Sequence, residues 1–391
     1  MDKKRKRRIR QLTVRLTAGL FLAAIFGLAF LNCILPDRKF SEQENRILEQ
    51  KPRLSLSSAM DGSYMEKYEA YQSDQFAGRD AWIEISTDLE LLLGRRESNQ
   101  VFKGKDHYLL EDLESDQGTN VQENIRAIHS FSEKNRNLQQ YFLIAPNAAE
   151  IWKNKLPAFA VTENQQEQLN KLRESLPEDV IWIDAYGALE QHKEEEIYYH
   201  TDHHWTSLGA WYAFEEAKKD MELNETYTEP LISCAVTDSF NGTLSARSGY
   251  ERGYREPIHI YFPDGESSTQ VVVHDVEKGE KRASLYVPEK LKEKDQYGVF
   301  LGGNSPLLDI QTTSESPEKL LIFKDSYANC LIPFLVPYYR QILVVDPRYY
   351  YGDITEIMRD NKISSVLFLY NGNTFVEDNS ISGVLNNDET E

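Results

Sequence analysis

Cysteine is scarce in this sequence: only three occur among 391 residues, at positions 33, 234 and 330. A single disulfide between Cys234 and Cys330 is the most that the chain can form beyond its apolar N-terminal stretch, and whether the two pair is left open. So few cysteines exclude a disulfide-rich secreted scaffold. The chain also lacks an H-E-x-x-H helix, a C-x-x-C pair and an internal repeat, so the commonest zinc motifs and solenoid folds are not indicated.

Negative charge greatly exceeds positive charge outside the first fifteen residues. The segment MDKKRKRRIRQLTVR holds eight Lys or Arg and one Asp, a net charge of +7, and the rest of the chain carries −26. So acidic a remainder argues against nucleic acid or an anionic lipid surface as its partner. A neutral glycan or a small acyl donor is easier to accommodate.

An apolar stretch follows the basic head. Leu16 to Leu35 is interrupted only by Thr17, Asn32 and a few small residues, and at about 1.5 Å per residue a helix of this length crosses a ~30 Å hydrocarbon core. A cleaved signal peptide is the alternative, but its apolar region is usually shorter and ends in an A-x-A-like site, which is not evident. Asn32 before Cys33 argues against lipoprotein processing.

The basic flank predicts the orientation of this single span. Lys and Arg remain on the cytoplasmic side of a membrane, so residues 1–15 are expected in the cytoplasm and residues 16–36 in the cell membrane as a signal-anchor. Everything after Pro36 is then expected to be extracytoplasmic.

The rest of the chain alternates between strand and helix patterns. Strands are predicted at 141–146, 180–186, 319–326, 341–346 and 364–371, and helices near 120–137, 163–175, 206–221, 328–339 and 353–361. Such alternation predicts an α/β fold with a parallel sheet covered by helices, whose functional residues follow the carboxyl ends of the strands. The remaining segments are expected to be a linker and helical segment (37–100, helical from 60), the two parts of the α/β domain (101–229, opening with a hairpin at 101–112, and 301–378), a β-rich insert (230–300) and a polar tail (379–391).

Three histidines and an aspartate gather in the stretch YYHTDHHWTSLGAWYAF, residues 198–214. In an extended segment, residues two apart point the same way, so Asp202 can lie beside His204 while His203 points away. A serine hydroxyl becomes nucleophilic when a base oriented by a carboxylate takes its proton. Ser326 follows the strand KLLIFKD at a strand-to-helix turn, where backbone N–H groups can stabilise an oxyanion.

Each of these features has another interpretation. Ser326 or Asp325 can simply cap the following helix. His200, Asp202, His203 and His204 offer enough ligands for a metal ion, although neighbouring histidines rarely converge on one. The histidines can also be hydrogen-bonded members of an aromatic core. The sequence calls for no cofactor and favours no metal, but these readings remain open.

Weaker candidates lie at other strand ends. The loop LGGN (301–304) can bring backbone N–H groups near a ligand, although Gly-Gly pairs are commonly plain turns. Asn147 follows the strand YFLIAP, and Asn371 ends the strand SSVLFLYN. Both are expected to line the same cleft if the strands are parallel.

The segment TDHHWTSLGAWYAF, with FSEQENR early and FKDSYAN late, resembles the bacterial DHHW protein family over roughly residues 37–378. That family is similar to SGNH-hydrolase-like proteins of polysaccharide O-acetylation, including the alginate O-acetyltransferase proteins. The resemblance implies a triad of Asp202, His204 and Ser326. By strand position alone, it matches Arg348 and Tyr370 to donors that polarise the acyl oxygen. One departure is Lys324, which stands where such enzymes usually have glycine and is expected to affect the turn or donor access.

The resemblance implies a membrane-anchored O-acyltransferase that acetylates a cell-envelope polysaccharide through an acyl-serine. It also implies a multispanning membrane acyltransferase as partner, because one helix cannot carry acyl groups across. A carbohydrate esterase with the same triad is one alternative. A non-catalytic glycan-binding or assembly protein is another, with the tyrosines of RYYYGD (348–353) and PYYR (337–340) stacking on sugars.

Overall fold

The computed structural model describes residues 3–41, 46–116, 118–264 and 269–387. The chain divides into two compact units, Met1–Gly94 and Arg95–Glu391. The division falls six residues before the boundary between 100 and 101 that the composition suggested. The expected tail from 379 begins with helix α14 (Ser380–Leu385) rather than with irregular chain.

The first unit begins with the long helix α1 (Lys3–Ile34). Its stretch Arg7–Ile34 meets the length and composition of a membrane span and has none of its apolar window buried. Two short strands, β1 (Phe40–Ser41) and β2 (Arg46–Ile47), follow as an antiparallel pair. The orientation of the span across a membrane stays a prediction.

Helices α2 (Leu56–Met60), α3 (Ser63–Asp74) and α4 (Arg79–Leu92) complete this unit. The sequence predicted one helical segment over 60–99. The helix is instead divided at Gly62 and Gly78, whose φ angles of +82° and +68° are left-handed values that glycine adopts without strain.

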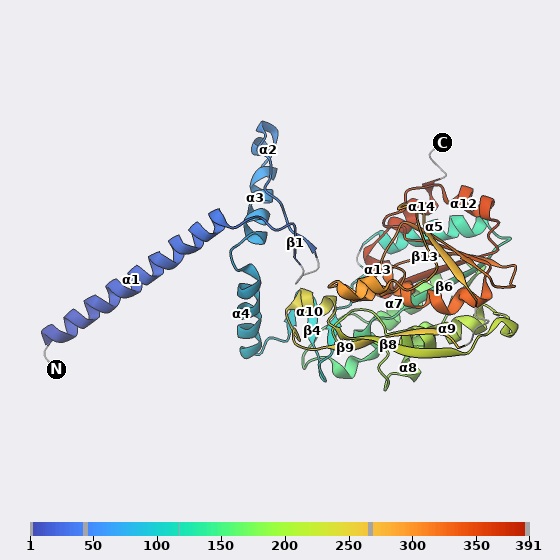
Figure 1. Cartoon of the computed structure of the whole chain (residues 1–391), viewed down its shortest axis with the longest axis horizontal. Coiled ribbons are helices and arrows are strands. Elements are labelled where there is room, and N and C mark those ends of the chain that lie inside the picture. The colour runs from blue at the N-terminus through green and yellow to red at the C-terminus, as the bar shows by residue number, and fades with distance from the viewer. Residues whose placement is uncertain (1–2, 42–45, 117, 265–268, 388–391) are drawn as a thin grey trace. The chain divides into compact units, whose positions relative to one another are not determined.

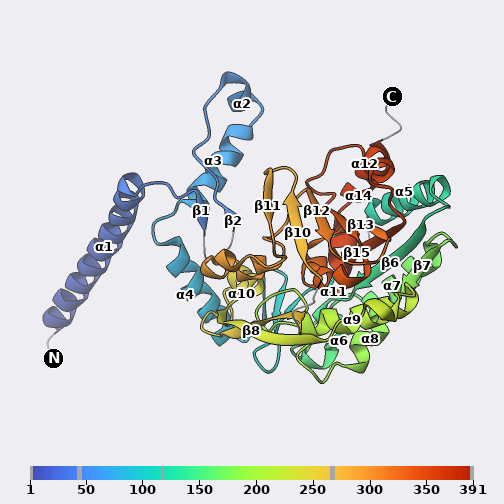
Figure 2. The same ribbon diagram turned by 45° about the vertical axis from the view of Figure 1, so that its right-hand side comes forward.

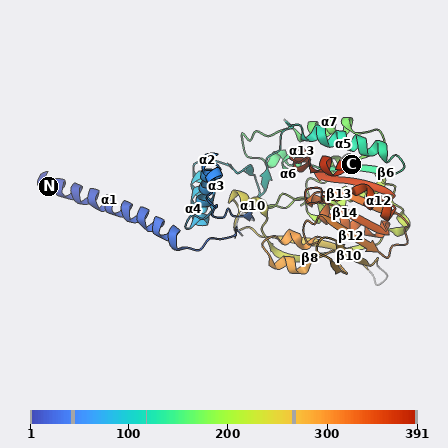
Figure 3. The same cartoon turned by 90° about the horizontal axis from the view of Figure 1, so that it is seen from above.

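The second unit is built on an eight-stranded sheet in the order β11-β10-β12-β14-β13-β15-β6-β7. Figure 3 shows this order from β6 through β13, β14 and β12 to β10. Five neighbouring strands are parallel, as predicted, and their central members are buried along nearly their whole length, as strands covered on both faces must be. They are β6 (Gln139–Ala145), β7 (Val180–Ile183), β13 (Lys319–Lys324), β14 (Gln341–Val345) and β15 (Ser365–Asn371).

Two layers of helices cover the sheet, and Figure 1 shows α5, α12 and α14 on one side with α8 and α9 on the other. The first layer packs on one face of the central strands and buries Phe323 and Phe368. The second layer packs on the opposite face and buries Ile322 and Leu367. The first layer contains α5 (Asn120–Lys134), α7 (Gln165–Ser175), α12 (Ile354–Asn361), α13 (Gly372–Glu377) and α14. The second contains α6 (Ala148–Ile151), α8 (Ala185–Gln191), α9 (Ser207–Asp220) and α11 (Ile332–Leu335).

The segment predicted as a β-rich insert is divided between two places. Strands β8 (Leu231–Phe240) and β9 (Glu256–Pro263) form a separate ribbon, with helix α10 (Thr243–Ser248) between them. Strands β10 (Val271–Asp275) and β11 (Glu280–Arg282) instead extend the main sheet, joined through β12 (Leu307–Thr312), which the sequence analysis did not predict (Figure 2). All three are antiparallel additions, so the sheet is mixed rather than wholly parallel.

Two other predictions are refined. The hairpin expected at 101–112 is part of a three-stranded sheet of β3 (Glu97–Ser98), β4 (Val101–Lys103) and β5 (Leu109–Glu111). The helix expected over 328–339 is three short helical turns, η5 (Ser326–Cys330), α11 and η6 (Val336–Tyr338). Pro333 and Pro337 interrupt it because proline lacks the N–H that a longer helix needs.

Candidate active site

Ser326 begins the first helical turn after the central strand β13. Asp325 is the residue that caps this turn, because its carboxylate accepts from the Tyr327 N–H at 2.9 Å and from the Asn371 N–H at 2.8 Å. The capping interpretation therefore applies to Asp325. The Ser326 hydroxyl points elsewhere, and its Oγ lies 2.8 Å from Nε2 of His204.

The loop of residues 200–204 holds the histidine, and it is not the extended segment that the spacing suggested. Tyr198 and Trp205 pair across the loop as an isolated antiparallel bridge, and the Tyr199 N–H donates to the His204 carbonyl. Between them the chain bends. The Asp202 carboxylate accepts from the His204 backbone N–H at 3.1 Å, so a local turn, and not the strand periodicity, brings carboxylate and imidazole together.

Asp202 and His204 form a tight, buried pair. Asp202 Oδ1 lies 2.5 Å from His204 Nδ1. The other carboxylate oxygen accepts from the Thr243 N–H at 2.8 Å and from the Thr243 hydroxyl at 2.9 Å. Gly242 packs so close behind that a Cβ there would lie 2.2 Å from the Asp202 Cβ. Both oxygens of the carboxylate thus have partners, as a buried charge requires.

Glu256 at the start of β9 fixes the rest of the loop. Its carboxylate accepts from the backbone N–H groups of His200 and Thr201, at 2.7 and 2.9 Å, and from the Thr201 hydroxyl at 2.6 Å. The Thr201 hydroxyl in turn accepts from the Gly242 N–H at 2.9 Å. The β8–β9 ribbon and α10 therefore position the Asp202 loop, a role that the sequence did not reveal.

Burial sets the protonation states. It lowers the pKa of His204 to about 4, assisted by His203 and opposed by Asp202. Burial works to raise the pKa of Asp202, but the charges of His204 and His203, with hydrogen bonds from His204 and Thr243, hold that pKa well below its ordinary value. Near pH 7 the pair is a neutral imidazole beside a carboxylate. With the ring proton on Nδ1 toward Asp202, Nε2 is left to accept the serine proton.

The metal interpretation named His200, Asp202, His203 and His204, and one ligand atom from each of the last three lies within 4.8 Å of the others. The contacts fit an ion poorly. Both nitrogens of His204 already face protein partners, and Nδ1 of His203 lies 2.8 Å from the Thr243 hydroxyl. Neutral imidazole offers a metal only one lone pair, so an ion here would have to displace the contacts of the triad.

Aromatic rings enclose His204, as the aromatic-core interpretation expected. The Tyr297 ring stacks on the imidazole with centroids 3.8 Å apart, and the Tyr327 ring lies 5.1 Å away. Trp205 is fully buried and donates from Nε1 to the Tyr327 carbonyl at 2.9 Å. Tyr297 was not a candidate from sequence, because nothing in DQYGVF marks it and the pairing crosses more than ninety residues.

Arg348 follows β14, the parallel neighbour of the strand β13 that leads to Ser326. Its Nε and Nη2 donate to the two oxygens of Asp346 at 2.8 and 2.7 Å. Lys324, the residue in place of the usual glycine, is buried and reaches toward the same carboxylate at 3.3 Å and to Asn304 Oδ1 at 2.9 Å. Lys324 therefore points across the sheet toward β14 and the LGGN loop.

The other candidates have structural partners. Asn371 donates from Nδ2 to the Ala145 carbonyl at 3.1 Å, while Asn147 accepts from Gln165 Nε2 at 2.8 Å. The Tyr370 ring is buried in the α5-side core, which lies between the sheet and the helix layer that contains α5. It packs on Phe375 with ring centroids 5.7 Å apart. Asp202, His204 and Ser326 are thus brought together. Asn371, Asn147 and Tyr370 instead contact neighbouring parts of the fold. All three cysteines are free, with Cys234 exposed and Cys330 buried.

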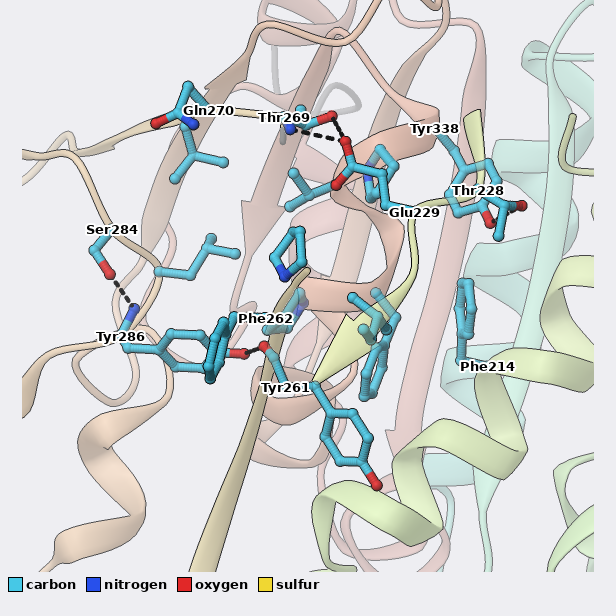
Figure 4. Close-up of a pocket in the computed structure, with 18 of the residues that line it drawn as sticks. Phe214, Thr228, Glu229, Tyr261, Phe262, Thr269, Gln270, Ser284, Tyr286 and Tyr338 are labelled. Carbon is cyan, nitrogen blue, oxygen red and sulfur yellow. Dashed lines mark hydrogen bonds between the residues drawn. The ribbon is translucent and has the colours of Figure 1, made fainter. Parts of the chain in front are cut away.

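A cavity of about 210 Å³ lies elsewhere, between α9, the β8–β9 ribbon and the turns before β14. Figure 4 shows its aromatic lining, including Phe214, Tyr261, Tyr286 and Tyr338, with Glu229 bonded to Thr269 at its edge. None of the triad residues lines it. The cavity is therefore separate from the candidate active site.

Comparisons with known proteins agree with this architecture. The family model described as DHHW protein matches residues 106–345. A solved structure of a DHHW family protein from Eubacterium siraeum is 25% identical, with a TM-score of 0.63 over 73% of this chain and 95% of that one. No protein of curated function matches the chain.

PatB1 from Bacillus cereus has a similar fold. Its structure with a sulfonyl adduct is 22% identical, with a TM-score of 0.59 over 72% of this chain and 97% of PatB1. A second structure of PatB1 is 23% identical, with a TM-score of 0.59 over 70% of this chain and 97% of PatB1. The second unit therefore has the SGNH-hydrolase-like α/β fold that the sequence predicted.

Proposed function

This chain belongs to the DHHW protein family, whose model matches more than half of its length, and we propose that it is a membrane-anchored O-acyltransferase. In this proposal Ser326 carries the acyl group, His204 moves the proton and Asp202 orients His204. The acceptor is a hydroxyl group of a cell-envelope polysaccharide, and the acyl group is acetyl.

One observation carries the proposal: the hydrogen-bonded series from Asp202 through His204 to Ser326, with contacts of 2.5 and 2.8 Å. The partly exposed serine lies at the carboxyl end of the central strand, where ligands bind in open α/β sheets. A base in contact with both a serine and an orienting carboxylate is the arrangement that activates a hydroxyl for acyl transfer. PatB1, which shares the fold, has been solved with a sulfonyl adduct, the product expected of a sulfonylating reagent and a nucleophile.

The first half of the reaction acylates the enzyme. The Ser326 oxygen attacks the carbonyl carbon of the acyl donor, and its proton passes to Nε2 of His204. The bond from the carbonyl carbon to the donor oxygen then breaks, and His204 returns the proton to the departing oxygen. Asp202 stabilises the imidazolium that exists between these two transfers.

The second half restores the enzyme. A sugar hydroxyl loses its proton to His204 while its oxygen attacks the acyl-serine, and the proton returns to Ser326 as the bond to the serine oxygen breaks. The Ser326 backbone N–H, with Arg348 after the neighbouring strand end, would stabilise the oxyanion in each half, because the Tyr327 N–H already donates to Asp325. Tyr370 is a weaker candidate for this role because its ring is buried in the α5-side core.

The helix α1 supports the location that we propose. A single span with a basic head would leave the second unit outside the cytoplasm, away from cytoplasmic acyl donors. One helix cannot transport acyl groups, so we infer a multispanning membrane acyltransferase as the partner that delivers them.

A sulfonylation experiment tests the nucleophile. The full chain in detergent micelles is treated with phenylmethylsulfonyl fluoride, and the labelled peptide is identified by mass spectrometry. We expect one sulfonyl group on Ser326, lost in Ser326→Ala and strongly reduced in His204→Ala. His203→Ala is the matched control, because His203 bonds Thr243 rather than Ser326, and it should keep most of the labelling. Labelling elsewhere, or equal labelling in His204→Ala, would contradict the proposal.

The molecule that receives the acetyl group, a sugar or water, distinguishes a transferase from an esterase. The full chain is given p-nitrophenyl acetate with and without a neutral oligosaccharide, and both free acetate and acetylated sugar are measured. A transferase should form acetylated sugar in the wild type and none in Ser326→Ala. Release of acetate alone, at a rate that the sugar does not change, would favour a carbohydrate esterase.

A further inference from the structure

The turn between β14 and α12 presents two tyrosine rings at the same edge of the sheet as Ser326. Tyr349 is 48% exposed and Tyr351 is 85% exposed, whereas Tyr350 between them is buried. The tyrosines of the PYYR segment, Tyr338 and Tyr339, are both buried. Of the two segments that the sequence offered for stacking on sugars, only RYYYGD has rings available to a ligand.

The backbone that holds these rings is well anchored. The Asp346 carbonyl accepts from the N–H groups of Tyr349 and Tyr350, each at 3.1 Å. The buried Tyr350 donates from its hydroxyl to the Asp353 carbonyl at 3.3 Å. At Gly352 a Cβ would lie 2.4 Å from the Tyr350 hydroxyl oxygen, so glycine is needed for this close packing. The two exposed rings therefore lie on either side of a residue that these contacts hold in place, which lowers the entropy lost when the rings bind a ligand.

Arg348 contacts one of these rings and follows the strand next to the one that leads to Ser326. Its guanidinium lies over the Tyr349 ring, with Cζ 5.5 Å from the centroid. Asp346 holds Nε and Nη2, and about a quarter of the side chain remains exposed. The charge of Arg348 contributes to lowering the pKa of His204. Parallel pairing of β13 with β14 places Ser326 and Arg348 after neighbouring strand ends.

We propose that Tyr349 and Tyr351 form an acceptor subsite that stacks on the sugar rings of a neutral polysaccharide beside Ser326. One face of a pyranose ring presents C–H groups that fit an aromatic ring, and its edges present hydroxyls that a guanidinium can bind. The net charge of −26 after residue 15 disfavours a polyanionic polymer. This inference rests on the proposed function, because it identifies the class of acceptor that the same site would take.

A binding experiment tests the subsite. The full chain in detergent micelles is titrated by calorimetry with cellohexaose and with N-acetylchitohexaose, two neutral hexasaccharides. We expect the wild type to bind at least one of them, and the double variant Tyr349→Ala/Tyr351→Ala to bind it about tenfold to a hundredfold more weakly. Phe159→Ala is the matched control, because Phe159 is a fully exposed ring in the connection from β6 to β7. It should bind as the wild type does.

The turnover of p-nitrophenyl acetate is measured on the same proteins and on the single variant Tyr351→Ala, because the small ester has no sugar to stack. It should remain within about twofold of wild type in Tyr351→Ala, since Tyr351 is 85% exposed and, unlike Tyr349, does not stack on Arg348. Unchanged hexasaccharide binding in the double variant, or no binding of either sugar by the wild type, would overturn the subsite. Absence of ester turnover from the wild type, with sugar binding that the tyrosines control, would instead refute the acyltransferase and leave the subsite standing.

Discussion

The phenol ring of Tyr297 lies nearly parallel to the imidazole of His204, with centroids 3.8 Å apart and an angle of 10° between the planes. The Tyr297 hydroxyl reaches the Ser326 carbonyl at 3.3 Å and the Cys330 thiol at 3.3 Å. One side chain thus contacts His204, the proposed base, and the turn that carries Ser326, the proposed nucleophile. The electron-rich face of a tyrosine also attracts a cation, so this stack should favour the imidazolium that forms during proton transfer.

Two substitutions of Tyr297 distinguish the contribution of its ring to activity from that of its hydroxyl. Tyr297→Leu removes the stack, and we expect kcat/KM for p-nitrophenyl acetate to fall about fivefold, because an aromatic or cation contact of this kind contributes about 1 kcal/mol. Tyr297→Phe keeps the ring and should retain at least about a third of the activity. Circular dichroism and thermal unfolding of both variants would identify loss of folding. Equal losses in the two variants would assign the effect to the hydroxyl.

The pH dependence should report the environment of His204. Burial lowers the pKa of His204 to about 4, below the ordinary value of about 6.5. Only the neutral imidazole accepts the serine proton, so activity should be present above this pKa and lost as the pH falls through it. The measurement is kcat/KM for the soluble ester from pH 3.5 to 8, and a midpoint at or above 6.5 would contradict the expectation.

His203→Gln supplies the comparison for this profile. His203 helps to lower the pKa of His204 through its charge. Removing that charge should move the acid limb toward higher pH while leaving the plateau nearly unchanged. A shift in the opposite direction would show that His203 does not act on His204 electrostatically.

The Asp202 carboxylate can occupy its position because Gly242, which lies against it, has no Cβ. A Cβ at Gly242 would lie 2.2 Å from the Asp202 Cβ and 2.5 Å from one of its oxygens, so Gly242→Ala must displace the loop or α10. We expect ester turnover to fall at least about a hundredfold, since a displacement of about 1 Å at a catalytic group has effects of this size. Gly253→Ala is the control, because no atom lies within 4 Å of the added methyl position. Comparable losses in both variants would exclude this steric explanation.

Lys324 and Asp346 form a buried ion pair between β13 and β14. Both side chains are at most 1% exposed, and Nζ lies 3.3 Å from Oδ2. Lys324→Met leaves the buried carboxylate with Arg348 as its remaining charged partner, so we expect the free energy of unfolding to fall by about 1–3 kcal/mol. Denaturant unfolding of the full chain in micelles measures this.

The control for Lys324 is an exposed lysine with a similar partner. Lys171 lies 2.8 Å from Glu167 on the surface of α7, and both side chains are more than half exposed. Lys171→Met should change the free energy of unfolding by less than about 0.5 kcal/mol. Equal effects of the two substitutions would mean that burial of the Lys324 pair contributes little.

Local sequence patterns predicted much of the fold. The central strands are continuous apolar segments because both faces are covered, and this composition was enough to predict β6, β13, β14 and β15 within a few residues. The Asp-x-His spacing and the strand-to-turn position of Ser326 were equally local. They are compatible with the contact between His204 and Ser326, which spans 122 residues in the sequence and which the resemblance to the DHHW protein family implied. A local turn, and not an extended segment, joins Asp202 to His204.

The tertiary structure determined the features that depend on contacts between residues far apart in the sequence. The antiparallel addition of β12, β10 and β11 depends on which sheet edge is open, and no local pattern encodes that. The support of the loop by Glu256 and Gly242, and the stack of Tyr297 on His204, arise where separate segments meet. Sequence alone thus determined which segments alternate and which residue types can do acyl chemistry. Only the fold decided their distances, burial and pKa values, because these depend on neighbours far away in the chain.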